Sequence, residues 1–212
     1  MPDSAAPEHL HRGNEEPFRF MVFGDFICPW SFAALDLVDR LATDYGLQPQ
    51  WRPHMLRPDV PPEGIPYPDD RRAETQAWIT ETAPDAAAKM HFPDRIQFSF
   101  RAFEALEYAR DQQADIAFAH AAFDALWRDG NDIATMATLT AAAETAGLDA
   151  DELAQALADG AYVQRALDAI RQAQRLEVTA TPTFILGRTR INGWHYYEVL
   201  QQVVEEQDVQ PV

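Results

Sequence analysis

The stretch Phe-Gly-Asp-Phe-Ile-Cys-Pro-Trp-Ser, residues 23–31, joins an apolar run to a helical pattern and contains the only cysteine of the chain, Cys28. The run Phe18–Ile27 is almost continuously apolar, which is typical of a strand buried on both faces of a sheet. Pro29 has a fixed φ and no N–H, and the first turn of a helix tolerates both. Cys28 is therefore expected at a helix N-terminus, where free N–H groups and the helix dipole favour a thiolate and lower the thiol pKa.

The residues that follow complete a strand–helix–strand unit. Apolar side chains recur at helical spacing over Ser31–Tyr45, and Gly46 is expected to end that helix in the left-handed conformation. Leu47–Arg52 is predicted to be a second strand. The next segment, Pro53–Asp70, contains six prolines and is expected to be a stiff loop that leaves the sheet.

The middle of the chain is helical by pattern from Arg71 to Arg175. Predicted helices cover residues 71–82, 100–112, 115–129, 133–146, 150–158 and 161–176, with Ser99, Asp132 and Asp149 as N-caps. Strand character returns at 182–186 and 189–191, and an amphipathic helix is predicted over 196–206. These patterns predict an α/β protein with a helical insertion.

The net charge, the apolar runs and the cysteine count of the chain argue against several classes of function. The formal net charge is −17, from 34 acidic and 17 basic residues. Such a surface repels phosphate backbones and anionic lipids, so no nucleic-acid or membrane role is expected. No apolar run approaches the ~20 residues that cross a bilayer, and the N-terminus lacks the apolar segment of a secretory signal, which predicts a cytoplasmic protein. One cysteine excludes an internal disulfide and a cysteine-based zinc site, and no metal site is expected.

The turn Cys-Pro-Trp-Ser after a strand resembles the active-site turn of the DsbA-like thioredoxin-fold proteins, and specifically their FrnE-like branch, which typically has Cys-Pro-Trp-Cys. Three further segments match in the expected order: Trp-Arg-Pro-His-Met-Leu-Arg-Pro-Asp-Val-Pro-Pro-Glu-Gly at 51–64, Gly-Ala-Tyr at 160–162 and Val-Thr-Ala-Thr-Pro-Thr-Phe at 178–184. The resemblance spans about residues 18–205. It implies a thioredoxin fold with a large inserted α-helical domain.

This resemblance predicts the domain organisation. Residues 17–70 and 175–212 would form the thioredoxin-like domain, and residues 71–174 the inserted helical domain. Residues 1–16 are polar and rich in proline, glutamate and histidine without periodicity, so they are expected to be disordered.

Ser31 stands where the resembled proteins carry a second cysteine. In a Cys-x-x-Cys protein the second thiol attacks the mixed disulfide and releases the substrate, which a hydroxyl cannot do. Ser31 can instead donate a hydrogen bond to the Cys28 thiolate and help to lower its pKa. A mixed disulfide on Cys28 should therefore persist until an external thiol resolves it.

The resemblance implies further site residues. Pro182 would be the cis-proline of the fold and lie opposite the cysteine, and Thr181 would offer backbone groups to a bound substrate. Pro29 and Trp30 are expected beside the thiol, with Trp30 either an exposed aromatic or a packing residue. Two weaker candidates follow from position alone. Asp25 is either a proton acceptor or a turn residue, and His54 follows the second predicted strand.

The favoured hypothesis is a thiol–disulfide oxidoreductase that acts through Cys28 as a monothiol. Two alternatives remain open. One is a glutathione-dependent isomerase or transferase, resembling 2-hydroxychromene-2-carboxylate isomerase, in which the protein activates the sulfur of bound glutathione. The other is a thioredoxin-fold module that binds extended peptides beside Pro182 without turnover. No tightly bound cofactor is expected, and glutathione is the candidate co-substrate. The expected partners are thiols and disulfides of proteins or small molecules, and a homodimer is left open.

Overall fold

A computed structural model of the chain describes residues 18–212, so the disorder predicted for residues 1–16 lies outside the described residues. Its centre is a four-stranded sheet in the order β2-β1-β5-β6. β1 (Phe20–Gly24) runs parallel to β2 (Gln50–Pro53) and antiparallel to β5 (Thr183–Leu186), which pairs with β6 (Thr189–Asn192). The predicted strand–helix–strand start and strand–strand–helix end are confirmed, and with them the thioredoxin fold.

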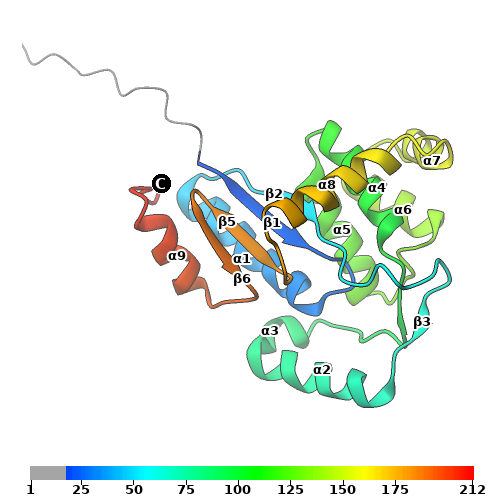
Figure 1. Ribbon diagram of the computed structural model, residues 1–212, viewed down its shortest axis with the longest axis horizontal. Coiled ribbons are helices and arrows are strands. Elements are labelled where there is room, and N and C mark those ends of the chain that lie inside the picture. Colours follow the sequence, from blue (N-terminus) through cyan, green and yellow to red (C-terminus); the bar gives the residue numbers. More distant parts are fainter. Residues whose placement is uncertain (1–17) are drawn as a thin grey trace, which may run out of the picture.

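Helices surround this sheet unevenly. α1 (Pro29–Tyr45) connects β1 to β2, and α9 (Tyr197–Glu205) follows β6. The insertion between β2 and β5 contains β3 (Ile65–Pro66), α2 (Asp69–Thr82), α3 (Pro84–Ala87), β4 (Arg95–Ile96), α4 (Phe100–Asp111), α5 (Asp115–Trp127), α6 (Met136–Thr145), α7 (Ala150–Ala158) and α8 (Val163–Arg175). Figure 1 shows α4–α8 grouped on one side of the sheet, α9 on the other, and α2 and α3 below.

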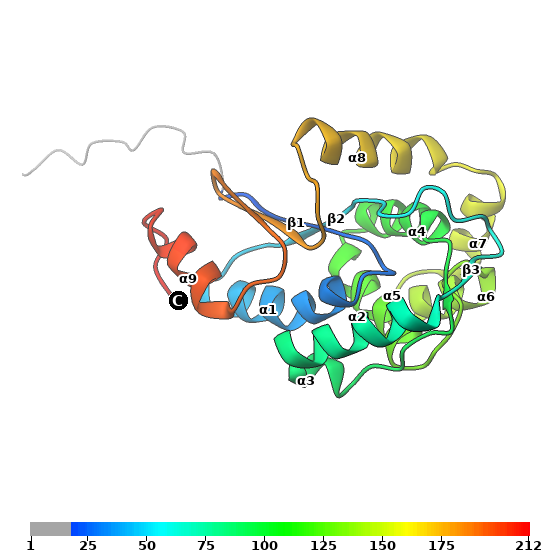
Figure 2. The same cartoon turned by 60° about the horizontal axis from the view of Figure 1, so that its bottom comes forward.

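Alternate residues of β1 supply two separate cores, because successive side chains of a strand point to opposite faces. Phe20 and Val22 belong to the large core that also includes residues of α1 and α9. Phe23 packs on the other face, with Ala173 of α8 and Val178. Figure 2 shows α1 and α8 on opposite sides of the strands. The sheet is buried on both faces, which explains the continuous apolar run that precedes the cysteine.

The outer edge of β2 is bonded to the helical insertion instead of being left open. The Trp51 N–H donates to Asp115 Oδ2 across 3.0 Å, and Arg110 Nη2 donates to the Trp51 carbonyl. Arg110 also contacts Asp115 and Glu107, at 3.3 and 3.2 Å. An open strand edge would offer unpaired backbone groups to other chains. These side chains satisfy that edge and hold the insertion against the sheet.

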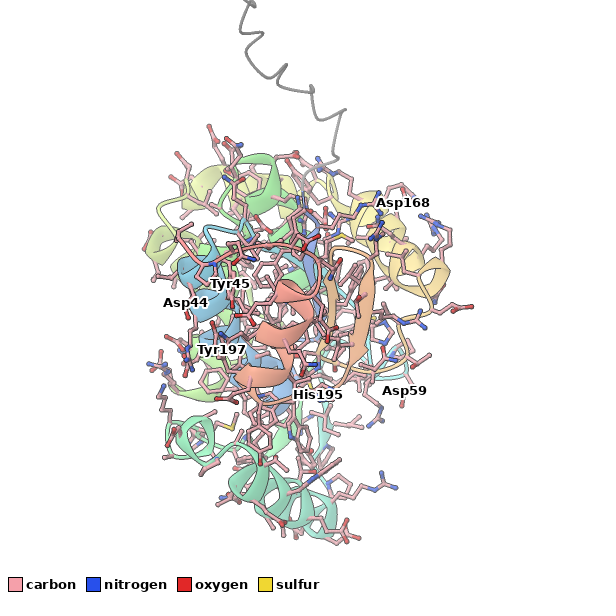
Figure 3. All side chains as sticks on the ribbon, turned by 90° about the vertical axis from the view of Figure 1, so that its left-hand side faces the viewer. Asp44, Tyr45, Asp59, Asp168, His195 and Tyr197 are labelled. Carbon is pink, nitrogen blue, oxygen red and sulfur yellow. The ribbon has the colours of Figure 1, made fainter. Side chains whose placement is uncertain are left out.

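The two helices on the large-core side are joined by tyrosines. Tyr197, at the start of α9, donates its hydroxyl to Asp44 near the end of α1, and Tyr45 donates to Glu205 across 2.6 Å. Figure 3 shows Asp44, Tyr45 and Tyr197 close together where α1 meets α9. Gly46 ends α1 with φ 61°, as predicted. The C-terminal helix is therefore bonded to the same helix that begins at the cysteine.

Some predicted boundaries are wrong for local reasons. Asp149 caps α7 by accepting from the Glu152 N–H, as predicted, but α6 begins after Thr135, not after Asp132. The Thr135 hydroxyl accepts from the Thr138 N–H, so residues 132–135 form the turn that precedes that helix. The short pairing of β3 with β4 was not predicted, and neither was the single-turn helix α3. Elements this short contain too few residues to show the periodicity of a strand or a helix.

Candidate active site

Cys28 is the N-cap residue of α1 and follows the short turn after the buried strand β1. Its N–H donates to the Asp25 carbonyl across 3.0 Å, and its carbonyl accepts from the Ser31 and Phe32 N–H groups. Its thiol donates to the Thr181 carbonyl oxygen across 3.5 Å. The Thr181–Pro182 peptide is cis, as the resemblance implies. The structure therefore brings together Cys28 and the proline loop, two segments far apart in sequence.

Burial raises the pKa of the Cys28 thiol, and the expected lowering by the helix start is wrong. The side chain is 4% exposed, and desolvation penalises the thiolate more than its polar neighbours stabilise it. Thr181 and Ser31 lower the pKa, and the negative charge of Asp25 raises it. A helix N-terminus favours a thiolate, but this sulfur is removed from water at the same time.

Two hydroxyls beside the sulfur have no hydrogen-bond partner of standard geometry. Ser31 Oγ and Thr181 Oγ1 are both buried and unpaired among residues 18–212, yet both lower the pKa of the Cys28 thiol. They lie near the sulfur without bonding to it in its protonated form. Buried polar groups normally find partners, so each hydroxyl is a donor that a thiolate at Cys28 would satisfy.

Asp25 is fully buried beneath the cysteine. Its carboxylate accepts from the Leu56 N–H across 2.7 Å and from the Ile27 N–H across 3.3 Å. Desolvation nevertheless raises the pKa of Asp25 to about 6. Its backbone carbonyl also closes the turn before Cys28, so the turn role is confirmed. A buried carboxyl with a pKa near neutrality beside a thiol is a candidate proton acceptor, so that role of Asp25 stays a prediction.

Cys28 lies on the wall of a cavity of about 670 Å³ between the sheet end and the insertion. Four tryptophans line it: Trp30 from α1, Trp78 from α2, Trp127 from α5 and Trp194 from the segment after β6. Trp30 and Trp78 contact each other with ring centroids 4.4 Å apart, and Trp30 Nε1 donates to the Thr82 hydroxyl across 3.1 Å. The volume is that of a small-molecule site. The sulfur is thus buried but faces a cavity.

The structure places the predicted site residues unequally around this cavity. Cys28, Pro29, Trp30 and Thr181 line it. Pro182 and Ser31 lie behind this wall, and Ser31 is fully buried. Trp30 is half-buried, so it is both a packing residue and part of the lining.

His54 is not among the cavity-lining residues. Burial lowers the pKa of its imidazole, and its Nδ1 has no partner within residues 18–212. Sequence reasoning missed Trp78, Arg57 and Arg95, which the structure brings to the cavity. A tryptophan on a polar helix, as Trp78 is on α2, was the available signal, since such a residue needs an apolar neighbour.

The raised thiol pKa gives a testable pH profile. Less thiolate is present at neutral pH than on a free cysteine, whose pKa is ~8.5, so alkylation of Cys28 by iodoacetamide should keep accelerating to higher pH. At about pH 8 the folded protein should therefore react more slowly than the same chain unfolded in urea. Rates measured across pH in both states check this. A folded-state profile displaced to lower pH would contradict it.

Other functional classes receive no support from the described part of the chain. Within residues 18–212, no three His, Cys, Asp or Glu side chains are grouped so that they could hold a metal ion. In the same residues, no helix has both the length and the apolar character needed to cross a membrane.

Three solved structures resemble the fold. A probable DsbA oxidoreductase from Streptomyces coelicolor is 23% identical, with a TM-score of 0.78 over 89% of this chain and 89% of that chain. The 2-hydroxychromene-2-carboxylate isomerase is 21% identical, with a TM-score of 0.69 over 89% and 94%. The cytosolic disulfide reductase DsbM from Pseudomonas aeruginosa, solved with GSH, is 18% identical, with a TM-score of 0.63 over 89% and 98%. At these identities the likeness shows the fold alone.

Sequence comparison identifies the family. An uncharacterized protein, YwbO from Bacillus subtilis, is 26% identical over 192 residues, covering 88% of this chain and 95% of that protein. The model of the DSBA-like thioredoxin domain matches residues 20–205, which includes every strand of the central sheet and the insertion between β2 and β5. This match agrees with the cysteine at the start of α1 and the cis-proline opposite it. The chain belongs to the family of DSBA-like thioredoxin domains.

Proposed function

We propose that the protein is a thiol–disulfide oxidoreductase that uses Cys28 as a monothiol and an external thiol, such as glutathione, as the resolving partner. One observation carries this proposal: the single sulfur of the chain sits at the start of α1, 3.5 Å from the Thr181 carbonyl, and faces a cavity. The family, whose members exchange thiols and disulfides, supports the reaction class. The Cys-Pro-Trp turn and the segment 51–64 support placement in the FrnE-like branch.

The reaction balances without any metal or oxidant. The Cys28 thiolate attacks one sulfur of a disulfide, forms a mixed disulfide with it and releases the other sulfur as a thiolate. A glutathione thiolate then attacks the substrate sulfur of the mixed disulfide, which forms a new disulfide and returns Cys28 as a thiolate. Ser31 provides no sulfur for internal resolution, so the second step requires the external thiol. The proton that the Cys28 thiol loses passes to solvent, and the released substrate thiolate takes one up, so protons balance as well.

The partner and the compartment are part of the same proposal. A structural neighbour is described as a cytosolic disulfide reductase and was solved with GSH, which supports glutathione and a cytosolic setting. The cavity volume of about 670 Å³ accommodates a tripeptide thiol. No tightly bound cofactor is needed, because the electrons come from the external thiol. The expected partners are therefore thiols and disulfides.

Incubation with oxidised glutathione followed by intact-mass measurement tests the proposal. The wild-type protein should gain a single glutathione, and reduced glutathione in excess should remove it. Cys28→Ser is expected to gain none, which is a complete loss of the adduct.

The outcome also separates the alternatives. If no adduct forms on the wild type while glutathione affinity is the same in Cys28→Ser, the sulfur of bound glutathione is the reacting group, as in a glutathione-dependent isomerase. If neither adduct nor glutathione affinity is found but peptides bind, the protein is a binding module. Either result overturns the monothiol reaction.

A further inference from the structure

The charge of the cavity is opposite to the charge of the protein. The chain has 34 acidic and 17 basic residues, so its surface is strongly negative. Among the cavity-lining residues that the structure describes, the charged side chains are Arg57 and Arg95, and no aspartate or glutamate is present. Because field lines concentrate in a low-dielectric cleft, two cations there act on a ligand more strongly than the distant acidic surface.

The two arginines differ in how their charge is balanced. Arg57 is held by Asp59 through Nε and Nη2, at 2.9 and 2.7 Å, but the Asp59 side chain is 63% exposed and is not part of the cavity lining. Figure 3 shows Asp59 at the edge of the molecule. Arg95 Nη2 donates to the Glu63 and Gly64 carbonyls, both at 2.9 Å. In residues 18–212 no carboxylate forms an ion pair with Arg95. Arg95 therefore keeps an unbalanced positive charge at the cavity, whereas Asp59, outside the lining, balances the charge of Arg57 in part.

The rest of the lining favours a flat apolar body of small size. The side chains of Trp30, Trp78, Trp127 and Trp194 line the cavity, and the Trp194 Nε1 is buried without a partner within residues 18–212. Aromatic ligands gain stacking energy on such rings in addition to area burial. Cys28 is only 4% exposed, so a small molecule that enters the cavity reaches its sulfur more readily than a disulfide on the surface of a folded protein does.

Resting on the proposed thiol chemistry of Cys28, we infer that the cavity selects low-molecular-weight aromatic disulfides that carry a carboxylate. The aromatic body packs among the four tryptophans, the carboxylate meets Arg57 and Arg95, and the disulfide is attacked by the Cys28 thiolate. One substrate sulfur becomes bonded to Cys28 and the other leaves as an aromatic thiolate, so electrons and atoms balance as in any thiol–disulfide exchange.

Two chromogenic disulfides separate charge from aromaticity. Dithiobis-nitrobenzoate is aromatic and carries carboxylates, whereas dithiodipyridine is aromatic and uncharged at neutral pH. The rate constant of Cys28 with each probe is divided by that of free cysteine with the same probe. The normalised constant of the carboxylate probe, divided by that of the uncharged probe, should exceed one, although the protein carries a net charge of −17. Arg57→Gln and Arg95→Gln should each lower this ratio about threefold, and the double variant about tenfold. Added salt should lower it as well.

Arg188→Gln is the matched control. It removes the same single charge from the exposed turn between β5 and β6, at the opposite end of β5 from Thr181. Its ratio should equal that of the wild type. A ratio that falls equally in Arg188→Gln, or that never favours the carboxylate probe, overturns the charge selection while leaving the proposed reaction intact. If neither probe modifies Cys28 in the folded chain although both modify the unfolded one, the proposed reaction fails and the inference fails with it. Thermal melts of each variant verify folding.

Discussion

Replacing Ser31 with cysteine is expected to give the protein an insulin-reducing activity at least about tenfold above wild type. Ser31 lies three residues after Cys28 in the first turn of α1, and its N–H donates to the Cys28 carbonyl across 3.1 Å. Its hydroxyl already affects the pKa of the neighbouring thiol, so a sulfur in its place is close enough to react. An attacking group held in position reacts as if at very high concentration. The mixed disulfide on Cys28 would then be resolved internally.

Two measurements check this result. After treatment with oxidised glutathione, Ser31→Cys should lose two hydrogens instead of gaining a glutathione, and insulin precipitation in dithiothreitol should accelerate. Thr189→Cys, which adds a thiol on the exposed strand β6, controls for a second cysteine as such. Ser31→Ala should still form the glutathione adduct. If Ser31→Cys keeps a glutathione adduct and shows no gain, the buried position of residue 31 prevents the internal attack.

The second large effect is expected on stability. Asp25→Asn should raise the free energy of unfolding at about pH 8 by about 2 kcal/mol, with no gain at about pH 4. The pKa of Asp25 is raised from 3.8 to about 6 in the folded protein, so folding favours its protonated form. The stability that this preference contributes is complete below 3.8 and is lost as the pH rises through about 6. About two pKa units correspond to about 3 kcal/mol, and the loss of the weaker hydrogen bond from Ile27 offsets part of the gain.

Urea denaturation of wild type and variant at the two pH values measures this difference. Asp129→Asn removes one exposed carboxylate from the loop after α5 and controls for the general repulsion of an acidic chain. A second readout is independent of folding. Because the charge of Asp25 raises the pKa of the Cys28 thiol, Asp25→Asn should speed alkylation of Cys28 at about pH 8. Destabilisation by Asp25→Asn at both pH values would show that its hydrogen bonds to Leu56 and Ile27 outweigh the cost of its buried charge.

Helix and strand patterns account for most of the fold. A buried strand shows as a continuous apolar run, and an amphipathic helix as a repeat of 3.6 residues, so β1, α1 and α7 were predicted within a few residues. The pairing of β3 with β4 was not predicted, because two-residue strands are too short to show a period. Helix α6 begins later than predicted, because Thr135 and not Asp132 caps its first turn. Local signals fail where the choice between neighbouring residues depends on contacts.

The cis bond before Pro182 illustrates a different limit. X–Pro bonds are cis in only ~5–6% of cases, so the residues themselves predict trans. Resemblance to a family supplied the opposite expectation, and the structure confirms it. The role of Thr181 beside the thiol follows from that geometry and could not be derived from its neighbours in sequence.

The sequence by itself determined the covalent chemistry and its position. A single cysteine with serine three residues later excludes internal resolution in any fold, and a proline after the cysteine places it at a helix start. Only the tertiary structure decided the direction of the thiol pKa and the composition of the cavity. Both depend on packing between segments that are distant in sequence: the Cys28 thiol bonds to the Thr181 carbonyl, and the cavity lining includes Trp78 and Arg95. Solvent exclusion is a property of packed surfaces, so no local pattern around residue 28 encodes it.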